Sequence, residues 1–373
     1  MPFAGISWSE HGFELVMIDE GGRQTTPPRT FPAGQIWGLV DHLRRTRQVR
    51  CVVDSTNGLI DGMLMEAGLP VYRADPGSLP PRPRFGSADA RALAGAAVHR
   101  FTELTLLDPV KGTLTGRRSE QFRQIARSEQ DAGPLRDAGR YVAYGDRSDP
   151  ARSIALTFDD GPNPPYTGMI LDVLARYGVP ATFFCVGMRA AAHPDELARI
   201  VASGHEVGNH TWSHPFLPDL SERELAEQVE RTDAAAGYPA ARLFRPPYGT
   251  RTPMLMSWLT GRHDGHRLVL WDVDSADWQR PGPDAIAKGV LKQSRPGSII
   301  LMHDGGGDRS QTVDALPAII DGLLADGYNL TLAGSLFPRK EKPHCLGPQP
   351  FPEPLSLSPL ITGRTPCAIR SRP

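Results

Sequence analysis

The second half of the chain alternates short apolar runs with longer segments in which apolar residues recur every three or four positions. The short runs have the length of buried strands, and each of the first six is followed by a segment that can supply a helix. About seven such repeats predict parallel strands that close, or nearly close, into a barrel. The runs are SIALTF, ATFFCVG, HEVGN, ARLFR, HRLVLWDV, SIILMH and YNLTLA.

The helical segments carry their own stop signals. In residues 167–178, Ile170, Val173 and Leu174 fall on one face of a helix, and Gly178 stands where such a helix ends. The segments HPDELARIVASG, ELAEQVERTDAAAG and TVDALPAIIDGLLADG repeat this arrangement. The pattern therefore predicts a distorted α/β barrel over residues 151–335.

Residues 1–110 have a different pattern of apolar and polar positions. An extended run (FAGISWSEHGFELVMID) comes first, and strand-like and helix-like segments then alternate, which predicts a smaller α/β domain. Residues 111–150 are polar, charged and without a sustained period, so we expect a connector there. Residues 336–373 are rich in Pro, Arg and Ser, and we expect a disordered tail.

Charge narrows the range of partners. The chain has 41 Lys and Arg against 42 Asp and Glu, so no overall field draws it to nucleic acid or to anionic lipid. Its first residues lack a basic region followed by an apolar run, and no apolar run approaches the roughly 20 residues that cross a bilayer. We therefore expect a cytoplasmic protein without a membrane partner.

Reactive side chains gather where the predicted strands of the second half end. In parallel α/β barrels the carboxyl ends of the strands form the rim on which loops build the active site. A random scatter of polar residues would not collect on one edge. The residues are Asp159, Asp160, His210, His214, Arg245, Asp274, Asp277, His303 and Asp304.

Two of these clusters suggest a metal-dependent hydrolase. In HTWSH, His210 and His214 are four residues apart, so a single helical turn would present both imidazoles on one side. Two histidines and one carboxylate are a common set of zinc ligands that leaves a position open for water. In TFDDGP, one of Asp159 and Asp160 would bind the metal, and the other would accept a proton from the attacking water.

At this point the residues resemble a known family. TFDDGP, HTWSH, RPPYG, DSADW and LMH occur in this order between residues 157 and 303. Together they resemble the five motifs of polysaccharide deacetylases (the NodB-homology domain, carbohydrate esterase family 4), over about 153–331. The resemblance implies a distorted (β/α)7-type barrel and an enzyme that removes acetyl groups from an N-acetylated amino sugar, an oligosaccharide or a sugar-containing metabolite.

The resemblance also implies a role for each residue. Asp160, His210 and His214 would bind a divalent metal, usually Zn²⁺, although Co²⁺ or another ion would also fit. Asp159 would be the general base, oriented by Arg245, and His303 the general acid, held by Asp277. Finally, Tyr248 would offer its backbone N–H to the developing oxyanion, while Trp278 and Leu301 would line a pocket for the acetyl methyl group.

A second resemblance concerns residues 3–100, which are similar to the RNase H-like amino-terminal domain of DEDD-type transposases. Those enzymes hold two magnesium ions with four carboxylates. The matching positions here are Ser7, Asp54, Gly86 and Asp89, so two of the four acids are missing. Because two carboxylates do not hold a pair of metal ions, we predict that this domain neither cuts nor joins DNA.

Other functions remain open at this stage. The motifs describe the chemistry rather than the leaving group, so a hydrolase of cyclic or acyl amides and an O-acetyl esterase both fit. A nucleic-acid-associated protein that acts through the amino-terminal domain is an alternative of another class, although the basic stretch HLRRTRQVR is better explained as a solvated helix face. The amino-terminal domain is also where we would expect a homo-oligomer to form.

Overall fold

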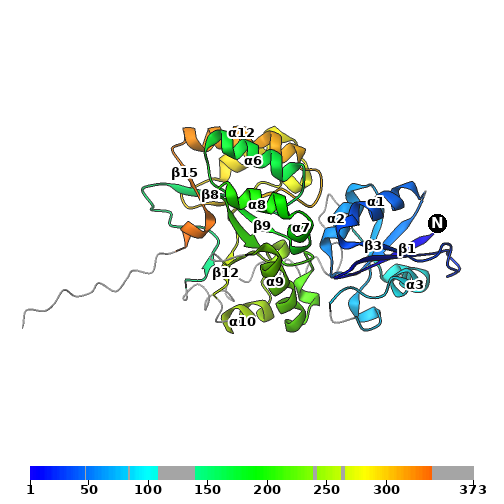
Figure 1. The fold of residues 1–373 in the computed structure, drawn as a ribbon. Helices are drawn as coiled ribbons and strands as arrows, with labels where there is room; N and C mark the ends of the chain where they lie inside the picture. Colours follow the sequence, from blue (N-terminus) through cyan, green and yellow to red (C-terminus); the bar gives the residue numbers. More distant parts are fainter. Residues whose placement is uncertain (47, 83–84, 108–138, 238–241, 262–264, 338–373) are drawn as a thin grey trace, which may run out of the picture. The chain divides into compact units, whose positions relative to one another are not determined.

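A computed structural model describes residues 1–46, 48–82, 85–107, 139–237, 242–261 and 265–337. Met1–Pro338 belong to one compact unit, which contains two sheets (Figure 1). The expected tail falls almost entirely outside the described residues. Its first two residues, Leu336 and Phe337, are buried and pack on the second sheet, so the described chain continues slightly beyond the predicted end of the barrel.

The first sheet, with its helices, forms the amino-terminal module. Its strand order is β3-β2-β1-β4-β5-β6, with β1–β2 antiparallel and β1–β4 and β4–β5 parallel. The segment expected to be a single extended run is a hairpin instead, because the chain turns between Ser9 and Gly12. The strands are β1 (Phe3–Ser9), β2 (Gly12–Ile18), β3 (Arg29–Pro32), β4 (Arg50–Val53), β5 (Val71–Arg73) and β6 (Thr105–Leu106).

Three helices cover the two faces of this sheet. Helices α1 (Ile36–Arg45) and α2 (Gly58–Glu66) share one apolar cluster with alternate residues of β1 such as Ala4 and Ile6. Helix α3 (Ala90–Arg100) packs with Phe3 on the opposite face (Figure 1). The period-two alternation of the strands thus builds two cores, and the prediction of a smaller α/β domain is confirmed.

The second sheet is parallel and has the strand order β13-β14-β8-β9-β10-β11-β12-β7, with β15 added to β8. Among the described residues this order has two ends, so the strands form a curled half-barrel that does not close. The predicted run HRLVLWDV is split between two strands. The strands are β7 (Tyr141–Val142), β8 (Ser153–Asp159), β9 (Thr182–Cys185), β10 (Glu206–Asn209), β11 (Leu243–Phe244), β12 (Arg267–Val269), β13 (Val273–Asp274), β14 (Ile299–His303) and β15 (Asn329–Thr331).

The helices of the half-barrel follow the predicted rhythm. Helices α6 and α9 end at Gly178 and Gly237, which both adopt the left-handed conformation that favours glycine. Helices α6, α8 and α12 lie together beside β8 and β9 (Figure 1). The helices are α6 (Tyr166–Tyr177), α7 (Gly187–Ala192), α8 (Pro194–Ala202), α9 (Glu222–Ala236), α10 (Pro253–Gly261), α11 (Pro283–Gln293) and α12 (Ser310–Ala325).

The segment expected to be a connector contributes a strand. Most of residues 111–150 lie outside the described residues, but Tyr141 and Val142 pair with Leu268 and Val269 of β12. Both residues are buried, so this edge of the half-barrel begins ten residues earlier than the predicted boundary at residue 151. A two-residue strand is too short to give a periodic signal, which is why the pattern missed it.

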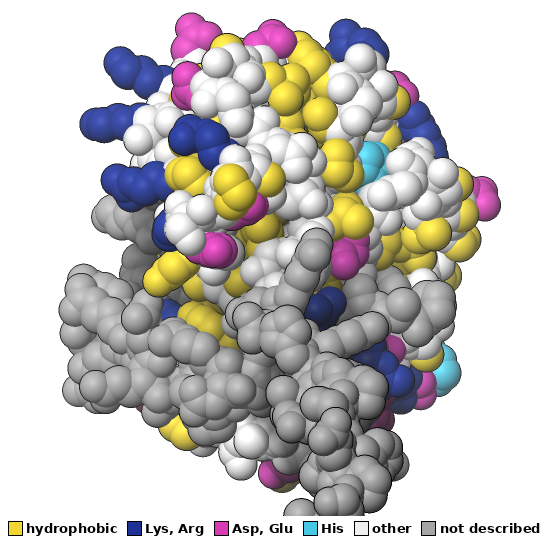
Figure 2. Space-filling view, turned by 90° about the vertical axis from the view of Figure 1, so that its left-hand side faces the viewer, with side chains coloured by type: hydrophobic (Ala, Val, Ile, Leu, Met, Phe, Trp, Pro, Cys, Tyr) yellow, Lys and Arg dark blue, Asp and Glu magenta, His cyan; other side chains and the backbone are white. Residues whose placement is uncertain are grey.

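Two observations bear on the expected partners. Among the described helices, none combines the length and the apolar character needed to cross a bilayer. On the face drawn in Figure 2, Lys and Arg side chains stand along one edge, and acidic side chains lie among them. Such mixing fits the nearly balanced charge of the chain and gives no support to an extended phosphate-binding surface there.

Candidate active site

The carboxyl end of β8 carries the two adjacent aspartates. Asp159 is the last residue of the strand, and in the sheet it lies directly beside His303 at the end of β14. Asp160 follows with a φ of 76°, a left-handed conformation that is uncommon for a residue other than glycine. Because the chain bends after β8, the carboxylates of Asp159 and Asp160 lie in different positions. Each can therefore have its own role in the chemistry.

The three predicted metal ligands come together at this end. Asp160 Oδ1 lies 3.3 Å from His214 Nε2 and 3.5 Å from His210 Nε2. Over the described part of the chain, they form the one group of three or more potential ligands whose donor atoms all lie within 4.8 Å of one another. Asp160 Oδ1 is buried and has no hydrogen-bond partner, as expected for an oxygen reserved for a cation. The residues therefore fit a divalent metal.

The two histidines do not lie on a helical turn, which corrects the prediction from their spacing. The segment that carries them is a loop in which Thr211 and His214 have φ values of 68° and 54°. The Gln228 side chain of α9 accepts the backbone N–H groups of Trp212 and Ser213 at 2.9 Å and holds the loop in this shape. Residues four apart thus bring both imidazoles to one point, but through a loop and not through a helical turn.

The protonation of the ligands suits metal binding. Burial lowers the pKa of His214 to about 4, so its imidazole is neutral at pH 7. Burial alone would raise the pKa of Asp160, but the neighbouring imidazoles of His214, His303 and His210 hold it well below its usual range. His210 Nδ1 lies 2.7 Å from the Arg245 carbonyl oxygen, which orients Nε2 toward the site.

Arg245 holds Asp159 in place. The fully buried guanidinium donates to Asp159 Oδ1 at 2.7 Å and to Thr157 Oγ1 at 2.8 Å. It also lies 4.0 Å above the Phe184 ring, which fixes its plane. Asp159 Oδ2 is left 3.7 Å from His210 Nε2, beside the metal ligands. Asp159 is therefore placed to accept a proton from a water that approaches the metal site.

His303 faces the site from β14 and is held by Asp277. The Nδ1–Oδ1 distance is 2.7 Å, and the other Asp277 oxygen accepts the His303 backbone N–H at 2.8 Å and the Thr312 hydroxyl at 2.7 Å. Burial would lower the pKa of His303, but the Asp277 carboxylate raises it to about 9. The imidazole is therefore protonated at neutral pH and can donate a proton.

This geometry is matched by known proteins. The family model for polysaccharide deacetylases covers residues 146–259. A chitooligosaccharide deacetylase of Rhizobium leguminosarum bv. trifolii is 42% identical over 204 residues, which are 51% of this chain and 94% of the relative. The chain belongs to the polysaccharide deacetylase family. It is a metal-dependent deacetylase, a hydrolase of C–N bonds other than peptide bonds.

Two further relatives agree with the family assignment. A peptidoglycan-N-acetylglucosamine deacetylase of Bacillus cereus is 38% identical over 187 residues, 49% of this chain and 87% of the relative. A crystal structure of a peptidoglycan N-acetylglucosamine deacetylase in complex with 4-naphthalen-1-yl-N-oxidanyl-benzamide is 38% identical and superimposes with a TM-score of 0.51 over 54% of this chain and 95% of that one. In each case the match spans about half of this deacetylase.

The remaining predicted site residues of the deacetylase also lie on the rim. Tyr248 is in the 3₁₀ turn η6 (Pro247–Gly249) with a φ of 59°, and its ring centroid is 4.7 Å from that of His214. Leu301 is buried in β14, and Trp278 is half-buried in η7 (Asp277–Gln279). The roles predicted for these three residues in binding the acetyl group remain predictions.

The amino-terminal module of the deacetylase contacts part of the rim of the half-barrel. The Gly58 N–H, at the start of α2, donates to the His214 carbonyl oxygen at 3.1 Å. A Cβ built on Gly62 would lie 3.6 Å from the carbonyl oxygen of Gly306, in the loop after β14. Helix α2 therefore touches both the loop after β10 and the loop after β14.

Strands β8 and β9 lie between β14 and β10 in the sheet. Glu66, the last residue of α2, also reaches the loop after β14, because a Cβ built on Gly307 would lie 3.5 Å from its Oε2. Val186 and Met188, which follow β9, join the apolar cluster of the module. No local motif signals these contacts, since Gly58 and His214 are 156 residues apart and Gly62 and Gly306 are 244 residues apart.

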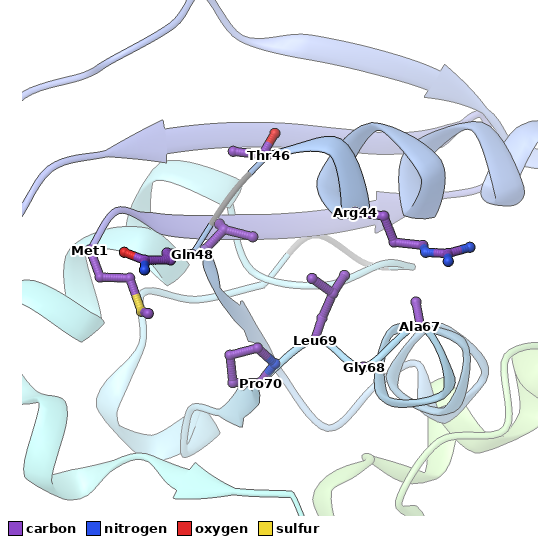
Figure 3. A pocket seen from close by; sticks show the side chains of 9 residues that line it. Met1, Arg44, Thr46, Gln48, Ala67, Gly68, Leu69 and Pro70 are labelled. Atoms are coloured by element: carbon purple, nitrogen blue, oxygen red, sulfur yellow. The ribbon is translucent and has the colours of Figure 1, made fainter.

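A hollow on the amino-terminal module is a different feature. It lies at the ends of α1 and α2 and is lined by residues that include Met1, Arg44 and Leu69 (Figure 3). The described residues of its lining include no histidine, cysteine, aspartate or glutamate. The hollow therefore offers neither metal ligands nor a general base, and the chemistry of the deacetylase belongs to the rim of the half-barrel.

Proposed function

We propose that this deacetylase removes the acetyl group from an N-acetylated amino sugar in an oligosaccharide, with a chito-oligosaccharide or a peptidoglycan fragment as substrate and Zn²⁺ as the metal. The proposal rests on the arrangement of Asp160, His210 and His214. They lie between the Asp159 carboxylate, which Arg245 holds, and the protonated imidazole of His303, which Asp277 holds. The names of the relatives support amino-sugar substrates, and two histidines with one carboxylate support zinc.

Each side chain has a step that its position allows. When bound, the metal supplies a positive charge that polarises the amide oxygen and makes a nearby water more acidic. Asp159 accepts the proton of the attacking water, and Arg245 keeps its carboxylate oriented. The Tyr248 backbone N–H stabilises the oxyanion, and His303 donates a proton to the departing nitrogen. That last proton is what separates amide hydrolysis from simple ester cleavage, since an amine is a poor leaving group until it is protonated.

The test is metal analysis of the purified protein followed by a substrate panel. Acetate release is measured with N-acetylglucosamine, its oligomers, peptidoglycan fragments, an O-acetylated sugar and a cyclic amide, before and after treatment with a chelator and after addition of Zn²⁺ or Co²⁺. We expect acetate and a free amine in equal amounts from the oligomers, loss of activity with the chelator and recovery with the metal. Turnover of the O-acetyl sugar or the cyclic amide alone would refute the proposed substrate.

As part of the same proposal, the deacetylase is located in the cytoplasm. A cytoplasmic enzyme would act on soluble oligosaccharides or metabolites rather than on assembled cell wall. Fractionation of cells that express the full chain with a carboxyl-terminal tag measures this directly, and recovery outside the cytoplasm would shift the proposal toward mature polymer.

A further inference from the structure

The amino-terminal module supplies no group to the proposed chemistry. The metal ligands, the base and the acid all belong to the half-barrel, at the carboxyl ends of its strands. Yet helix α2 of the module lies against the same rim, where the Gly58 N–H donates to the carbonyl oxygen of the metal ligand His214. What the module adds at this contact therefore concerns the surroundings of the site, where a substrate must fit.

Helix α2 turns one face toward the rim of the half-barrel. Gly58, Gly62 and Glu66 stand four residues apart, so they share one face of the helix. A Cβ built on Gly62 would lie 3.6 Å from the Gly306 carbonyl oxygen. A Cβ built on Gly307 would lie 3.5 Å from Glu66 Oε2. The second half of this face therefore contacts the loop that follows β14.

This loop also touches the metal site. A Cβ built on Gly306 would lie 2.6 Å from Oδ2 of the metal ligand Asp160. Glu66, which contacts the next residue of the loop, is exposed at the end of α2. The Glu66 carboxylate therefore lies at the surface, next to the loop that borders the metal ligands.

The position of the acid shows on which side of the site the sugar lies. In the proposed mechanism His303 donates a proton to the departing nitrogen, and that nitrogen belongs to the amino sugar. The sugar must therefore lie beside His303, whereas the acetyl carbonyl points toward the metal. His303 is the last residue of β14, directly before the loop that Glu66 contacts, so Glu66 lies on the sugar side of the site.

We propose that Glu66 is a specificity-determining residue: its carboxylate binds hydroxyl groups of the sugar next to the one that loses its acetyl group, and it disfavours a sugar that carries a carboxylate there. The inference rests on the proposed function and chooses between its two substrates. A chito-oligosaccharide is neutral, and its O–H and N–H groups can donate to a carboxylate. The N-acetylmuramic acid of peptidoglycan carries a lactyl carboxylate, which Glu66 repels.

The cations Arg309 and Arg280 of this part of the rim are already engaged. Arg309 is 5% exposed, and its Nε and Nη2 donate to two backbone carbonyl oxygens of the loop at 2.6 and 2.8 Å. Arg280, directly after η7, forms an ion pair with Asp308. A substrate that approaches the loop after β14 therefore meets the exposed Glu66 carboxylate rather than the buried Arg309 guanidinium.

The test compares a neutral and an anionic substrate of the same length: a tetramer of N-acetylglucosamine and a peptidoglycan tetrasaccharide without peptide. Burial on one side raises the pKa of Glu66, so acetate release is measured at pH 8, far above the ordinary glutamate pKa of about 4.3. We expect the wild-type kcat/KM to be about fivefold or more higher for the tetramer. In Glu66→Gln this preference should fall about threefold, through KM, with metal content unchanged. Glu66→Lys should lower it further.

Ionic strength separates an effect of charge from a change of shape. Salt screens exposed charges, so an increase from about 20 to about 500 mM should reduce the wild-type preference and leave that of Glu66→Gln unchanged. Glu103→Gln is the matched control. Glu103 is exposed in η3 (Phe101–Glu103), which packs with α3 on the opposite face of the module's sheet. This variant should keep the wild-type preference at both salt concentrations.

The outcomes for the inference and for the proposed function are distinct. A wild type that prefers the anionic tetrasaccharide, or a preference that Glu66→Gln leaves unchanged, would overturn the inference. Because Glu66 is exposed, its substitution should leave the fold intact, and an unchanged melting temperature checks this. A wild type that releases acetate from neither substrate would refute the proposed function, and the role of Glu66 with it.

Discussion

In two regions of the molecule an aspartate directly follows a strand, and among the described residues only the aspartate at the rim of the half-barrel belongs to a group that could hold a metal. At the rim of the half-barrel, Asp160 Oδ1 has no hydrogen-bond partner and faces two imidazoles. In the amino-terminal module, Asp54 is buried, but its Oδ1 accepts the Thr56 N–H and its Oδ2 the Ala88 N–H, both at 2.9 Å. The difference lies in what the oxygens already bind.

The second remaining acid of the module is occupied in the same way. Asp89 accepts the backbone N–H groups of Arg91 and Ala92 and caps helix α3. Part of the hydrogen-bonding capacity of both acids is thus used within the module, and the other matching positions, Ser7 and Gly86, contribute no carboxylate. That the module does not cut DNA stays a prediction, and the comparison shows that both of its remaining acids already bind backbone N–H groups.

Substitutions at the rim of the half-barrel should have the largest effects on metal binding and turnover. His210→Ala should lose the bound metal and with it all measurable turnover. Asp159→Asn should keep the metal but lower kcat by about 10²–10⁴, because the proton acceptor is lost while the ligands remain. Metal content by mass spectrometry and acetate release measure both, with Asp54→Asn as the control that should retain the metal. An Asp159→Asn enzyme with wild-type turnover would show that the base has been misassigned.

The next effect concerns pH. His303 must be protonated to act as the acid, so activity is retained below its pKa and is lost as pH rises through it. Asp277 raises that pKa to about 9 in the metal-free site, and a bound cation would repel the imidazolium and place the alkaline limit somewhat lower. Asp277→Asn should move the limit to lower pH by at least one unit, since burial then dominates. An unchanged kcat–pH profile would exclude His303 as the acid.

A smaller effect should mark the contact between the module and the rim. A Cβ on Gly58 would lie 2.4 Å from the His214 carbonyl oxygen and 2.5 Å from the Tyr248 hydroxyl. Gly58→Ala should therefore cost about 1–3 kcal/mol of stability and weaken metal binding. Gly95→Ala is the matched control, because a Cβ there meets nothing within 4 Å, and it should stabilise α3 by about 0.5–1 kcal/mol. Thermal melts with and without metal compare the two, and equal melting temperatures would contradict the described contact.

The smallest effect returns to the acids of the module. Asp89→Ala removes the cap of α3 and should lower the free energy of unfolding by about 1 kcal/mol. Turnover and metal content should stay at the wild-type values. A loss of metal in Asp89→Ala, measured by the same mass spectrometry, would mean that the module does hold a cation.

Much of the half-barrel was predictable because its signals are local. The alternation of strands and helices, with glycines such as Gly178 at the helix ends, follows from residues close together in the chain. The rule that parallel strands end on one rim then brings Asp160, His210 and His214 together without any knowledge of distances. The loop that carries the histidines was not predictable, since its shape depends on Gln228, which belongs to a later helix.

The unpredicted features all depend on contacts between distant parts of the chain. The strand at Tyr141–Val142 exists because β12 offers it an edge, and its two residues carry no pattern of their own. Likewise, nothing near Gly58 in the sequence points to the His214 carbonyl oxygen, which accepts its backbone N–H. The family motifs describe the metal site but include no residue outside the half-barrel.

The contact between the amino-terminal module and the ligand loop links metal binding to the stability of the whole unit. Three hydrogen bonds join the two segments: Gly58 N–H to the His214 carbonyl, Phe216 N–H to the Ser55 carbonyl, and the Ser213 hydroxyl to the Thr56 carbonyl. An ion that binds only the folded loop stabilises whatever must be folded for that loop to keep its shape. By this linkage we expect a bound cation to stabilise the loop from Ser55 to Gly58 together with the catalytic rim.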